Sequence, residues 1–424
     1  MPARRRRSDP SADRAGGGLR RAWKNPAVTD PTHSLAATIT GADAPGRLDR
    51  LMAAISGSEV EILDLEQTVV RGQLSIGLLL AATPETADAV ADRLAGSCAR
   101  LGLSLSMAEG VGDNPPRLNR TIVTILGRPL LTAHLATTAR VIAGLGGNID
   151  RSRRLSRTPL TTVELWVSNV EPAALRTELA AAAASTGFDV SVSAAGLARL
   201  GRRLVVMDVD STLIRDEVID LVAAHAGRQS EVAAITERAM RGELDFAESL
   251  RQRVAALAGL PIGVLDEVRR SVRLTPGART LIATLHDLGL SIGVVSGGFI
   301  EVVGPLATEL GITYARANRL DVAGGRLTGR IAGPIVDRAA KAATLREWAA
   351  TEHLPLARTI AIGDGANDLD MLAAAGLGIA FNAKPAVRAS ADTSLNLPYL
   401  DAVLFLLGLT REEVEAAAAA RQDG

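Results

Sequence analysis

Three apolar runs in the second half of the chain, each followed directly by polar residues, constrain its fold more than any other feature. The runs and their polar continuations are LVVMDVDSTLI (204–214), SIGVVSGGF (291–299) and TIAIGDGANDLDM (359–371). Uninterrupted apolar strands are typical of parallel sheets that helices cover on both faces. Functional groups of such sheets lie at the carboxyl ends of the strands, so we expect Asp208, Ser296 and Asp364 to meet at one edge.

The region 200–412 is predicted to be one α/β domain with an open parallel Rossmann-like sheet. Helical patterns separate its apolar strands. Residues 216–274, between the first two strands, read as several helices and are too long for a simple crossover, so we predict a small helical cap there. The segment 320–331 contains the pair Gly324-Gly325, which predicts a β-hairpin.

The chain between His33 and Gly196 repeats one pattern with a period of roughly 85 residues. Each copy reads as strand, helix, two strands, helix and strand. That order is the ferredoxin-like βαββαβ unit, an antiparallel sheet with two helices on one face. We therefore predict two such domains, at 33–112 and 118–196. Neither copy holds a cluster of His, Cys or carboxylates suited to chemistry, which favours binding or assembly.

The composition excludes several classes of function. The 47 basic and 47 acidic residues cancel, whereas binding to nucleic acid or an acidic membrane needs clustered positive charge, so the expected partner is a small molecule. The longest apolar stretches fall far short of the roughly 18 residues that a bilayer span needs. A single cysteine, Cys98, excludes an intrachain disulfide and a multi-thiolate metal site, and it favours a reducing, cytoplasmic location.

Residues 1–32 are rich in Arg, Gly, Ser and Pro, and their lack of apolar periodicity predicts a disordered basic tail. A twin-arginine export signal is the alternative interpretation of Arg4–Arg7. Such signals continue into an apolar segment, whereas Ser, Asp, Pro and Gly follow here, so we favour an unstructured tail.

Four carboxylates fall on two loops at one edge of the predicted sheet. They are Asp208, Asp210, Asp364 and Asp368. Packed together without partners, they would repel one another and raise one another's pKa, and a hard divalent cation resolves that conflict. Mg²⁺ favours oxygen ligands and commonly shares its coordination shell with a substrate phosphate.

Further residues of the same domain suit a phosphate group. Ser296 and the amides that follow it, including that of Gly297, offer hydrogen bonds to phosphate oxygens. Lys341 offers a compact cation. The chain has only three lysines, Lys24, Lys341 and Lys384, and otherwise uses arginine. A lysine here therefore indicates that the site needs a compact ammonium charge rather than the planar guanidinium of arginine. The set favours phosphoryl transfer, in which positioning and charge neutralisation account for most of the catalysis.

These motifs resemble those of the haloacid dehalogenase superfamily and, within it, of the phosphoserine phosphatases. DVDST (208–212) matches the first family motif, Ser296 the second, Lys341 the third and GDGANDLDM (363–371) the fourth. The resemblance covers essentially all of Arg202–Leu409.

The resemblance implies a role for each matched residue. Asp208 is implied to be the nucleophile that forms an aspartyl-phosphate, and Asp210 the acid that protonates the leaving alkoxide and then activates water. Lys341 is implied to neutralise the nucleophile and the phosphate. Asn367 is implied to lie near the substrate.

The resemblance also implies a Mg²⁺ cofactor. Its ligands would be Asp208, the backbone carbonyl of Asp210 and Asp364, and Asp368 would orient the metal shell. This assignment agrees with the repulsion argument, since a cation would neutralise the clustered carboxylates.

The cap implies the identity of the substrate. Glu217 matches the family residue that pairs with the substrate ammonium, and Arg253 the one that binds its carboxylate. Met240 and Phe246 match the apolar walls, because MRGELDFAESLRQRV keeps the family spacing. Taken singly, Glu217 and Arg253 would more often be solvated helix residues, and their joint spacing with the apolar pair supports the site. An anion binder, a cation binder and a phosphate site together describe a phosphorylated amino acid.

The first βαββαβ copy, with GADAPGRLDRLMAAI at 41–55, resembles an ACT domain, and the second resembles a more diverged one. In that family the loop between the first strand and the first helix holds a free amino acid and signals allosterically. The matching positions are Asp43, Gly46 and Gly127, where glycine permits close backbone approach and a helix N-terminus favours a carboxylate. The alternative is that this loop is only a turn before a helix, and that the copies serve dimerisation.

Together the resemblances imply a Mg²⁺-dependent phosphatase that converts phosphoserine to serine in the last step of serine biosynthesis. It would be a homodimer or higher homo-oligomer, regulated by an amino acid such as serine at the ACT-like domains. One alternative keeps the chemistry and changes the substrate to phosphohomoserine or another small phosphomonoester. A second is an amino-acid-sensing regulator with a vestigial phosphatase domain, which the intact nucleophile, acid, lysine and metal set disfavours.

Overall fold

The computed structural model describes residues 33–58, 60–114, 117–196, 201 and 203–423. The chain divides into two compact units, Met1–Pro116 and Arg117–Gly424. The predicted basic tail, with Arg4–Arg7, lies outside the described residues. Within those ranges, every helix is too short or too polar to cross a membrane.

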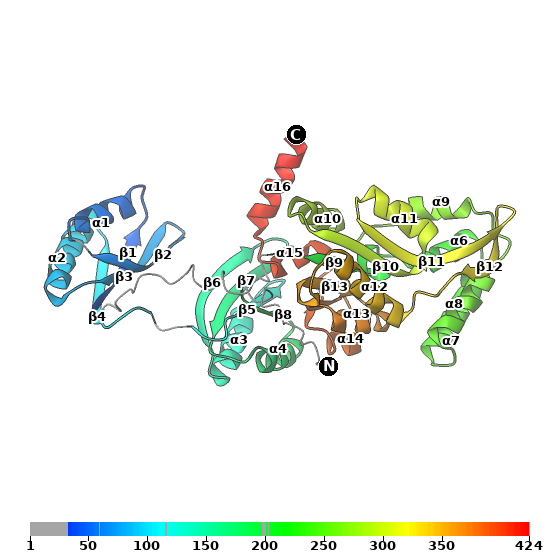
Figure 1. Cartoon of the computed structure of the whole chain (residues 1–424), viewed down its shortest axis with the longest axis horizontal. Helices are drawn as coiled ribbons and strands as arrows, with labels where there is room; N and C mark the ends of the chain where they lie inside the picture. Colours follow the sequence, from blue (N-terminus) through cyan, green and yellow to red (C-terminus); the bar gives the residue numbers. More distant parts are fainter. Residues whose placement is uncertain (1–32, 59, 115–116, 197–200, 202, 424) are drawn as a thin grey trace, which may run out of the picture. The chain divides into compact units, whose positions relative to one another are not determined.

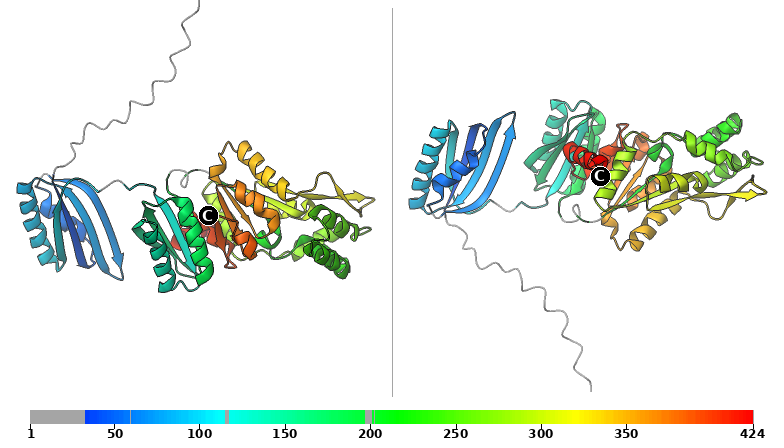
Figure 2. Two further views of the ribbon diagram at one scale, coloured as in Figure 1. Left: turned by 90° about the horizontal axis from the view of Figure 1, so that it is seen from below. Right: turned by 90° about the horizontal axis from the view of Figure 1, so that it is seen from above.

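The first unit contains one βαββαβ module (Figures 1 and 2). Its elements are β1 (Ser34–Ala42), α1 (Arg47–Ile55), β2 (Glu61–Val70), β3 (Gln73–Ala81), α2 (Pro84–Leu101) and β4 (Ser104–Gly110). The strands form an antiparallel sheet in the order β2-β3-β1-β4. Alternate residues along β1 and β3, such as Leu35, Ile39 and Ile76, form a core with Leu51 and Leu94 of the two helices.

The second unit begins with another βαββαβ module. Its elements are β5 (Thr121–Gly127), α3 (Thr132–Gly144), β6 (Asn148–Ser156), β7 (Thr161–Ser168), α4 (Pro172–Thr186) and β8 (Asp189–Ala194). The antiparallel strand order β8-β5-β7-β6 repeats that of the first module element for element. Both copies therefore have the topology that the sequence repeat predicts.

The other strands of the second unit form the predicted open sheet. They are β9 (Leu204–Met207), β10 (Ser291–Phe299), β11 (Tyr314–Ala323), β12 (Arg326–Ala332), β13 (Thr359–Gly363), β14 (Leu377–Phe381) and β15 (Thr393–Leu395). Their order is β12-β11-β10-β9-β13-β14-β15, and all neighbours are parallel except β12, which is antiparallel to β11. Gly324 and Gly325, both with positive φ, make the turn of the predicted hairpin.

Helices cover both faces of this sheet (Figure 2). They are α10 (Ala278–Asp287), α11 (Ile300–Glu309), α12 (Arg338–Thr351), α13 (Leu369–Ala374), α14 (Pro385–Arg388) and α15 (Val403–Leu406). The C-terminal helix α16 (Arg411–Asp423) instead extends away from this sheet (Figure 1). Side chains alternate between the faces along each strand. Val205 of β9 accordingly packs in one core cluster with Leu281 of α10, and Val206 in another with Trp348 of α12.

Between β9 and β10 the chain forms four helices in the predicted cap region. They are α6 (Val218–His225), α7 (Gln229–Met240), α8 (Phe246–Ala255) and α9 (Val264–Ser271). Three backbone hydrogen bonds of 2.8–2.9 Å join the α8–α9 connection to the β11–β12 hairpin, namely Gly259 N–H to Leu327 O, Leu327 N–H to Leu260 O and Ile262 N–H to Gly325 O. The cap region is therefore attached to the sheet beside β12 (Figure 1).

The second module and the α/β domain share one sheet, a continuity that the sequence patterns do not reveal. β15 pairs with β8 in antiparallel fashion through Thr393 and Ser191, whose hydroxyl oxygens lie 2.8 Å apart. The result is a single 11-stranded sheet. Leu126, Leu155 and Leu160 of the second module also join a core cluster of the α/β domain.

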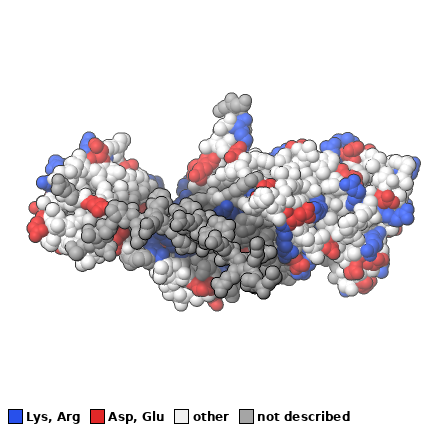
Figure 3. Space-filling view, in the orientation of Figure 1, with Lys and Arg blue, Asp and Glu red and all other residues white. Residues whose placement is uncertain are grey.

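Charged side chains of both signs are interspersed on the face of the α/β domain in Figure 3. The α/β domain also contains exposed ion pairs, such as Arg279 with Glu309 at 2.8 Å and Arg316 with Glu347 at 2.7 Å. Exposed pairs of this kind contribute little stability each. The described surface on this face therefore shows alternating charge rather than one extended field of a single sign.

Candidate active site

The carboxyl ends of three neighbouring parallel strands carry the predicted site residues. β10, β9 and β13 are adjacent in the sheet. Asp208 follows β9, Asp364 follows β13, and Ser296 lies near the end of β10. Because the strands are parallel and adjacent, their ends share one edge, and the polar residues meet there as the sequence predicts.

Lys341 lies between two carboxylates at the centre of the site. Its Nζ is 2.7 Å from Asp208 Oδ2 and 2.7 Å from Asp368 Oδ1, and all three side chains are buried. Burial raises the pKa of Asp208 well above its usual range, the charge of Asp368 adds to this rise, and Lys341 opposes it. Burial alone would lower the pKa of Lys341, but the two carboxylates hold that pKa above its usual value, so the lysine keeps its proton.

The start of α12 positions Lys341. Asp337 caps this helix, since its Oδ1 accepts a hydrogen bond from the N–H of Ala340 at 2.8 Å. The N–H of Lys341 donates to the carbonyl oxygen of Asp337 at 3.0 Å. The cap fixes where the first turn begins, and therefore the direction in which the lysine side chain leaves the helix.

Asp210 accepts hydrogen bonds on both carboxylate oxygens. Ser296 Oγ donates to its Oδ2 at 2.7 Å, and the N–H of Val218 donates to its Oδ1 at 2.7 Å. The N–H of Gly298 in turn donates to Ser296 Oγ at 2.7 Å. A Cβ on Gly298 would lie 3.0 Å from Ser296 Oγ and 3.1 Å from Asp210 Oδ2, so a larger residue here would press on this hydrogen-bonded pair.

Three carboxylates are grouped closely enough to bind a metal ion. Asp208, Asp364 and Asp368 offer oxygens that all lie within 4.8 Å of one another. Burial, together with the charge of Asp368, raises the pKa of Asp364 to about 6, while a 3.1 Å hydrogen bond from Thr212 Oγ1 opposes the rise. Lys341 alone does not neutralise three carboxylates, and oxygen donors at this spacing fit a hard divalent cation.

Glycines let the loop after β13 close around Asp368. A Cβ on Gly363 would lie 2.5 Å from Asp368 Cγ, and one on Gly365 would overlap the side chain of Asn367. The N–H of Gly365 donates to Asp368 Oδ2 at 3.0 Å. The loop thus holds Asp368 inside the site and leaves Asn367 partly exposed at its rim.

Glu217 and Arg253 of the cap region lie close enough to Asp210 for its charge to affect both of their pKa values. Burial lowers the pKa of Arg253, and its buried Nε has no hydrogen-bond partner in the described part of the chain. Ser211 Oγ donates to Glu217 Oε1 at 3.0 Å. The Glu217 side chain reaches solvent, yet partial desolvation and the charge of Asp210 raise the pKa of Glu217 to about 7.

Phe246 covers the loop that contains Gly297. A Cβ on Gly297 would lie 3.3 Å from Cζ of the Phe246 ring, and 36% of Phe246 is exposed. Met240 ends α7, and its side chain is outside the described set. One of the two predicted apolar walls is therefore at the site, and the role of Met240 stays a prediction.

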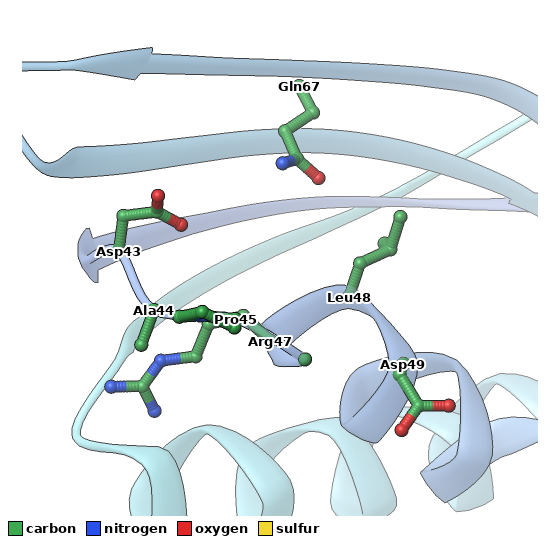
Figure 4. A pocket seen from close by; sticks show the side chains of 8 residues that line it. Asp43, Ala44, Pro45, Arg47, Leu48, Asp49 and Gln67 are labelled. Carbon is green, nitrogen blue, oxygen red and sulfur yellow. The ribbon is translucent and has the colours of Figure 1, made fainter.

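The residues matched to an ACT ligand loop belong to the two βαββαβ modules. Asp43 and Gly46 line an open pocket in the first unit (Figure 4), together with Ala44, Pro45, Arg47, Leu48, Asp49 and Gln67. In Figure 4, Asp43 and Leu48 extend toward the strands, and Gln67 extends from β2 toward the helix. Gly127 lies in the second unit, where a Cβ would be 3.0 Å from Leu130 Cα, so this position is already crowded.

Sequence reasoning missed three side chains that support the site. Thr212 bonds to Asp364, Asp337 caps the lysine helix, and Asn318 Nδ2 donates to the carbonyl oxygen of Gly297 at 2.8 Å. Thr212 closes the first motif and Asp337 precedes a helical pattern, so both carried a local signal. Asn318 is a single amide inside a strand, and nothing in its neighbourhood along the chain marks it.

Comparison with protein families agrees with this architecture. Residues 205–373 match the haloacid dehalogenase-like hydrolases. Residues 33–108 and residues 120–215 each match the ACT domain. The hydrolase match contains Asp208, Ser296 and Lys341.

Individual relatives match over more than the α/β domain. A phosphoserine phosphatase of Streptomyces coelicolor is 54% identical over 391 residues, which are 92% of this chain and 95% of the relative. One from Mycobacterium tuberculosis is 50% identical over 390 residues, 91% of this chain and 95% of the relative.

Two solved structures resemble the fold. The crystal structure of a probable phosphoserine phosphatase from Vibrio cholerae has a TM-score of 0.55 and 34% identity, and the match covers 72% of this chain and 89% of that one. A haloacid dehalogenase family hydrolase from Salmonella enterica serovar Typhi has a TM-score of 0.58 and 28% identity, with 68% and 98% covered. Sequence and structure comparisons therefore agree on the same group of enzymes.

Proposed function

The chain belongs to the phosphoserine phosphatases of the haloacid dehalogenase superfamily, and on this premise we propose that it hydrolyses O-phospho-L-serine to L-serine and phosphate through an aspartyl-phosphate intermediate. The observation that carries the proposal is the buried group of Asp208, Lys341 and Asp368 beside the hydrogen-bonded pair of Asp210 and Ser296. A nucleophile, its counter-charge and a proton carrier meet at one edge of the sheet.

Asp208 is the proposed nucleophile. One oxygen of its carboxylate attacks phosphorus, an O–P bond forms, and the bond from phosphorus to the serine oxygen breaks. Asp210 gives its proton to the departing serine oxygen. The hydrogen bonds from Ser296 and Val218 support this role, because they hold the Asp210 carboxyl in one orientation.

The second step releases phosphate. Asp210, now a carboxylate, takes a proton from a water molecule, whose oxygen attacks phosphorus as the bond to Asp208 breaks. Lys341 stays cationic throughout and reduces the repulsion between the Asp208 carboxylate and the phosphate oxygens. Its raised pKa supports this role, since the ammonium does not act as an acid near neutral pH.

We propose Mg²⁺ as the cation that completes the site. Asp208, Asp364 and the backbone carbonyl of Asp210 would hold it, with Asp368 beside them. The close carboxylate oxygens support a hard divalent ion of this kind. When bound, it supplies positive charge that neutralises the carboxylates and the substrate phosphate.

Recognition of phosphoserine is assigned to the cap and the loop after β10. Arg253 would bind the substrate carboxylate, and its partnerless buried Nε supports an anionic ligand there. Glu217 would pair with the ammonium, while Phe246 and Met240 form apolar walls. Ser296, Lys341, Asn367 and the amide of Gly297 would contact the phosphate end of the substrate.

Regulation is assigned to the first module. Its open pocket, with Asp43 and Gly46 at the start of α1, supports binding of a small amino acid such as serine. The ACT match of both modules supports amino-acid control. A cytoplasmic homodimer remains the proposed state of the enzyme.

Replacing the nucleophile tests the proposed chemistry. Asp208→Asn is expected to lower phosphate release from phosphoserine by about 10³-fold or more, because the amide cannot form the acyl-phosphate. Circular dichroism and the thermal midpoint verify that the variant is folded. The control, Asp266→Asn on the exposed face of α9, is expected to keep full activity.

A substrate panel separates phosphoserine from its competitors. The value of kcat/KM is expected to be highest for phosphoserine among phosphoserine, phosphohomoserine and p-nitrophenyl phosphate, after chelation and return of Mg²⁺. Full activity of Asp208→Asn would contradict the mechanism. A higher kcat/KM for phosphohomoserine would change the substrate and keep the mechanism.

Calorimetry with serine tests the proposed regulation. Wild-type protein is expected to bind serine at up to millimolar concentration, and Asp43→Ala to lose this binding while keeping catalytic kcat. Asp88→Ala, an exposed carboxylate on α2, is the matched control and is expected to bind normally. Equal heats for all three proteins would remove Asp43 from the proposed sensor.

A further inference from the structure

The loop that carries Ser296 is an irregular part of the sheet. Val295 of β10 pairs with Arg316 of β11, and Phe299 pairs with Asn318, so β10 advances four residues while β11 advances two. The residues between, Ser296 to Gly298, have no matching ladder positions on β11. The backbone alone therefore does not fix this loop against its neighbour strand.

The side chain of Asn318 supplies the missing connection. Its Nδ2 donates to the carbonyl oxygen of Gly297 at 2.8 Å, and its Oδ1 accepts from the N–H of Val336 at 2.8 Å. Asn318 is 0% exposed. One partner is an acceptor and the other a donor, so only one orientation of the amide satisfies both.

One peptide plane connects Asn318 to the catalytic hydroxyl. The carbonyl oxygen of Gly297 and the N–H of Gly298 belong to the same peptide group and point in opposite directions. Asn318 holds the oxygen end, and the N–H end donates to Ser296 Oγ at 2.7 Å. Ser296 Oγ then donates to Asp210 Oδ2 at 2.7 Å. The orientation of this peptide thus decides whether Ser296 can present its proton to Asp210.

The second hydrogen bond of Asn318 reaches the lysine side of the site. Val336 immediately precedes Asp337, the residue that caps α12. Lys341 lies in the first turn of that helix. Asn318 therefore touches both segments that bring polar groups to Asp208 and Asp210, although it is not itself in contact with either aspartate.

We propose that Asn318 is a positioning residue for the phosphatase reaction, which holds the Gly297–Gly298 peptide so that Ser296 orients Asp210. The proposal rests on the roles proposed above for Ser296 and Asp210. It assigns to β11 a part in catalysis that none of the four sequence motifs contains. A chain of aligned hydrogen bonds of this kind acts as a unit, because each bond polarises the next.

Two variants of Asn318 test the positioning role. Asn318→Ala removes both hydrogen bonds. Asn318→Asp keeps the shape and the bond from Val336, but it places an acceptor against the carbonyl oxygen of Gly297. Both are expected to lower kcat by about 10–100-fold, as a small misplacement of a catalytic group does, with KM changed less than about threefold. Wild-type kcat in either folded variant would overturn the proposal.

A double-mutant cycle with Ser296→Ala separates positioning from general damage. If Asn318 acts through Ser296, adding Asn318→Ala to Ser296→Ala is expected to lower kcat by less than about threefold further. A variant that only reduced the folded fraction would lower kcat by the same factor in both backgrounds. If the kcat of the double variant falls by the product of the two single-variant factors, the proposal is overturned.

A matched control removes a buried hydrogen bond elsewhere. Thr393→Val deletes the hydroxyl that contacts Ser191 at the sheet junction, and it is expected to keep wild-type kcat. All proteins are assayed with phosphoserine and with p-nitrophenyl phosphate. If the wild type hydrolyses only p-nitrophenyl phosphate, the proposed substrate fails, and the Asn318 comparison is made with p-nitrophenyl phosphate.

Discussion

The two βαββαβ modules have the same strand order, but their first strands are buried differently. In β1 the residues alternate, with Thr38 and Thr40 exposed on either side of buried Ile39. Every residue of β5 is buried. When the two strands are aligned on Gly41 and Gly127, Leu126 of β5 takes the position of Thr40. Leu126 packs in a core cluster of the α/β domain. One module keeps a solvated sheet face, and the other has lost it.

The loops that follow β1 and β5 also differ in their surroundings. In the second module Arg128 donates to the hydroxyl of Tyr399 at 2.8 Å, and its guanidinium lies 5.6 Å from the centre of that ring. In the first module Asp43 lines an open pocket. The comparison teaches that one fold can extend the catalytic sheet in one copy and keep a solvated sheet face and an open pocket in the other. It supports placing the proposed amino-acid sensor in the first copy.

Truncation is expected to give the largest difference between the modules. A fragment 117–424 should keep kcat/KM within about threefold of the full chain, because it retains the whole second unit. A fragment 201–424 loses Leu126, Leu155 and Leu160 from its core cluster, about 5–9 kcal/mol of burial against a typical stability of about 5–15 kcal/mol. It should fail to fold, as measured by circular dichroism and urea unfolding. A folded, active fragment 201–424 would contradict the comparison.

Substitutions at equivalent positions of β1 and β5 are expected to change the free energy of unfolding by unequal amounts, and both effects are smaller than that of truncation. Leu126→Ala should lower the free energy of unfolding of the second unit by about 2–5 kcal/mol, since it leaves a cavity in a filled core. Thr40→Ala, its counterpart in the first module, is exposed and should change stability by less than about 0.5 kcal/mol. Equal effects in urea unfolding would show that the two sheets are buried alike.

The sheet junction should add a pH dependence to the stability of the second unit. Asp189 of β8 accepts hydrogen bonds from the backbone N–H and from Nδ2 of Asn396, at 2.8 and 2.5 Å. Burial raises the pKa of Asp189 from 3.8 to about 6, although those bonds oppose the rise. The folded state thus keeps this proton to a higher pH than the unfolded chain does, so the stabilisation is complete below about pH 4 and is lost as pH rises through about 6.

Asp189→Asn is the variant that measures this effect. The shift corresponds to at most about 3 kcal/mol, so from pH 4 to 7 the wild type should lose up to about that much more unfolding free energy than the variant. Urea unfolding at several pH values gives the comparison. If the free energy of unfolding changes with pH equally in the two proteins, Asp189 is not the source of the pH dependence.

Local patterns in the sequence were sufficient for most of the fold. The runs at 204–207 and 359–363 are short and wholly apolar, and they form the buried strands β9 and β13. The glycine pair at 324–325 formed the turn of the expected hairpin. The polar residues after the strands meet at one edge because parallel topology alone brings them together.

Contacts between distant segments were beyond local patterns. β15 has only three residues, Thr393–Leu395, which is too short for any periodicity, so its pairing with β8 could not be read from the chain. At the end of β5 the adjacent apolar residues Ile125 and Leu126 stand where the first copy has Ile39 and Thr40, and this one substitution is too local to identify the surface that covers β5. Asn318 offered no local signal, because its two partners, Gly297 and Val336, are distant along the chain and are backbone groups.

The hydrogen bonds between the α8–α9 connection and the β11–β12 hairpin restrict movement of the cap region as one body. Rotation of the whole cap would break the bonds of Gly259, Leu327 and Ile262 together. The turn between α7 and α8 has its own local backbone hydrogen bonds and exposed ion pairs of Glu243 with Arg238 and Arg241, and exposed pairs of this kind contribute little stability. Displacement of that turn alone would leave the three backbone hydrogen bonds between the cap region and the hairpin intact.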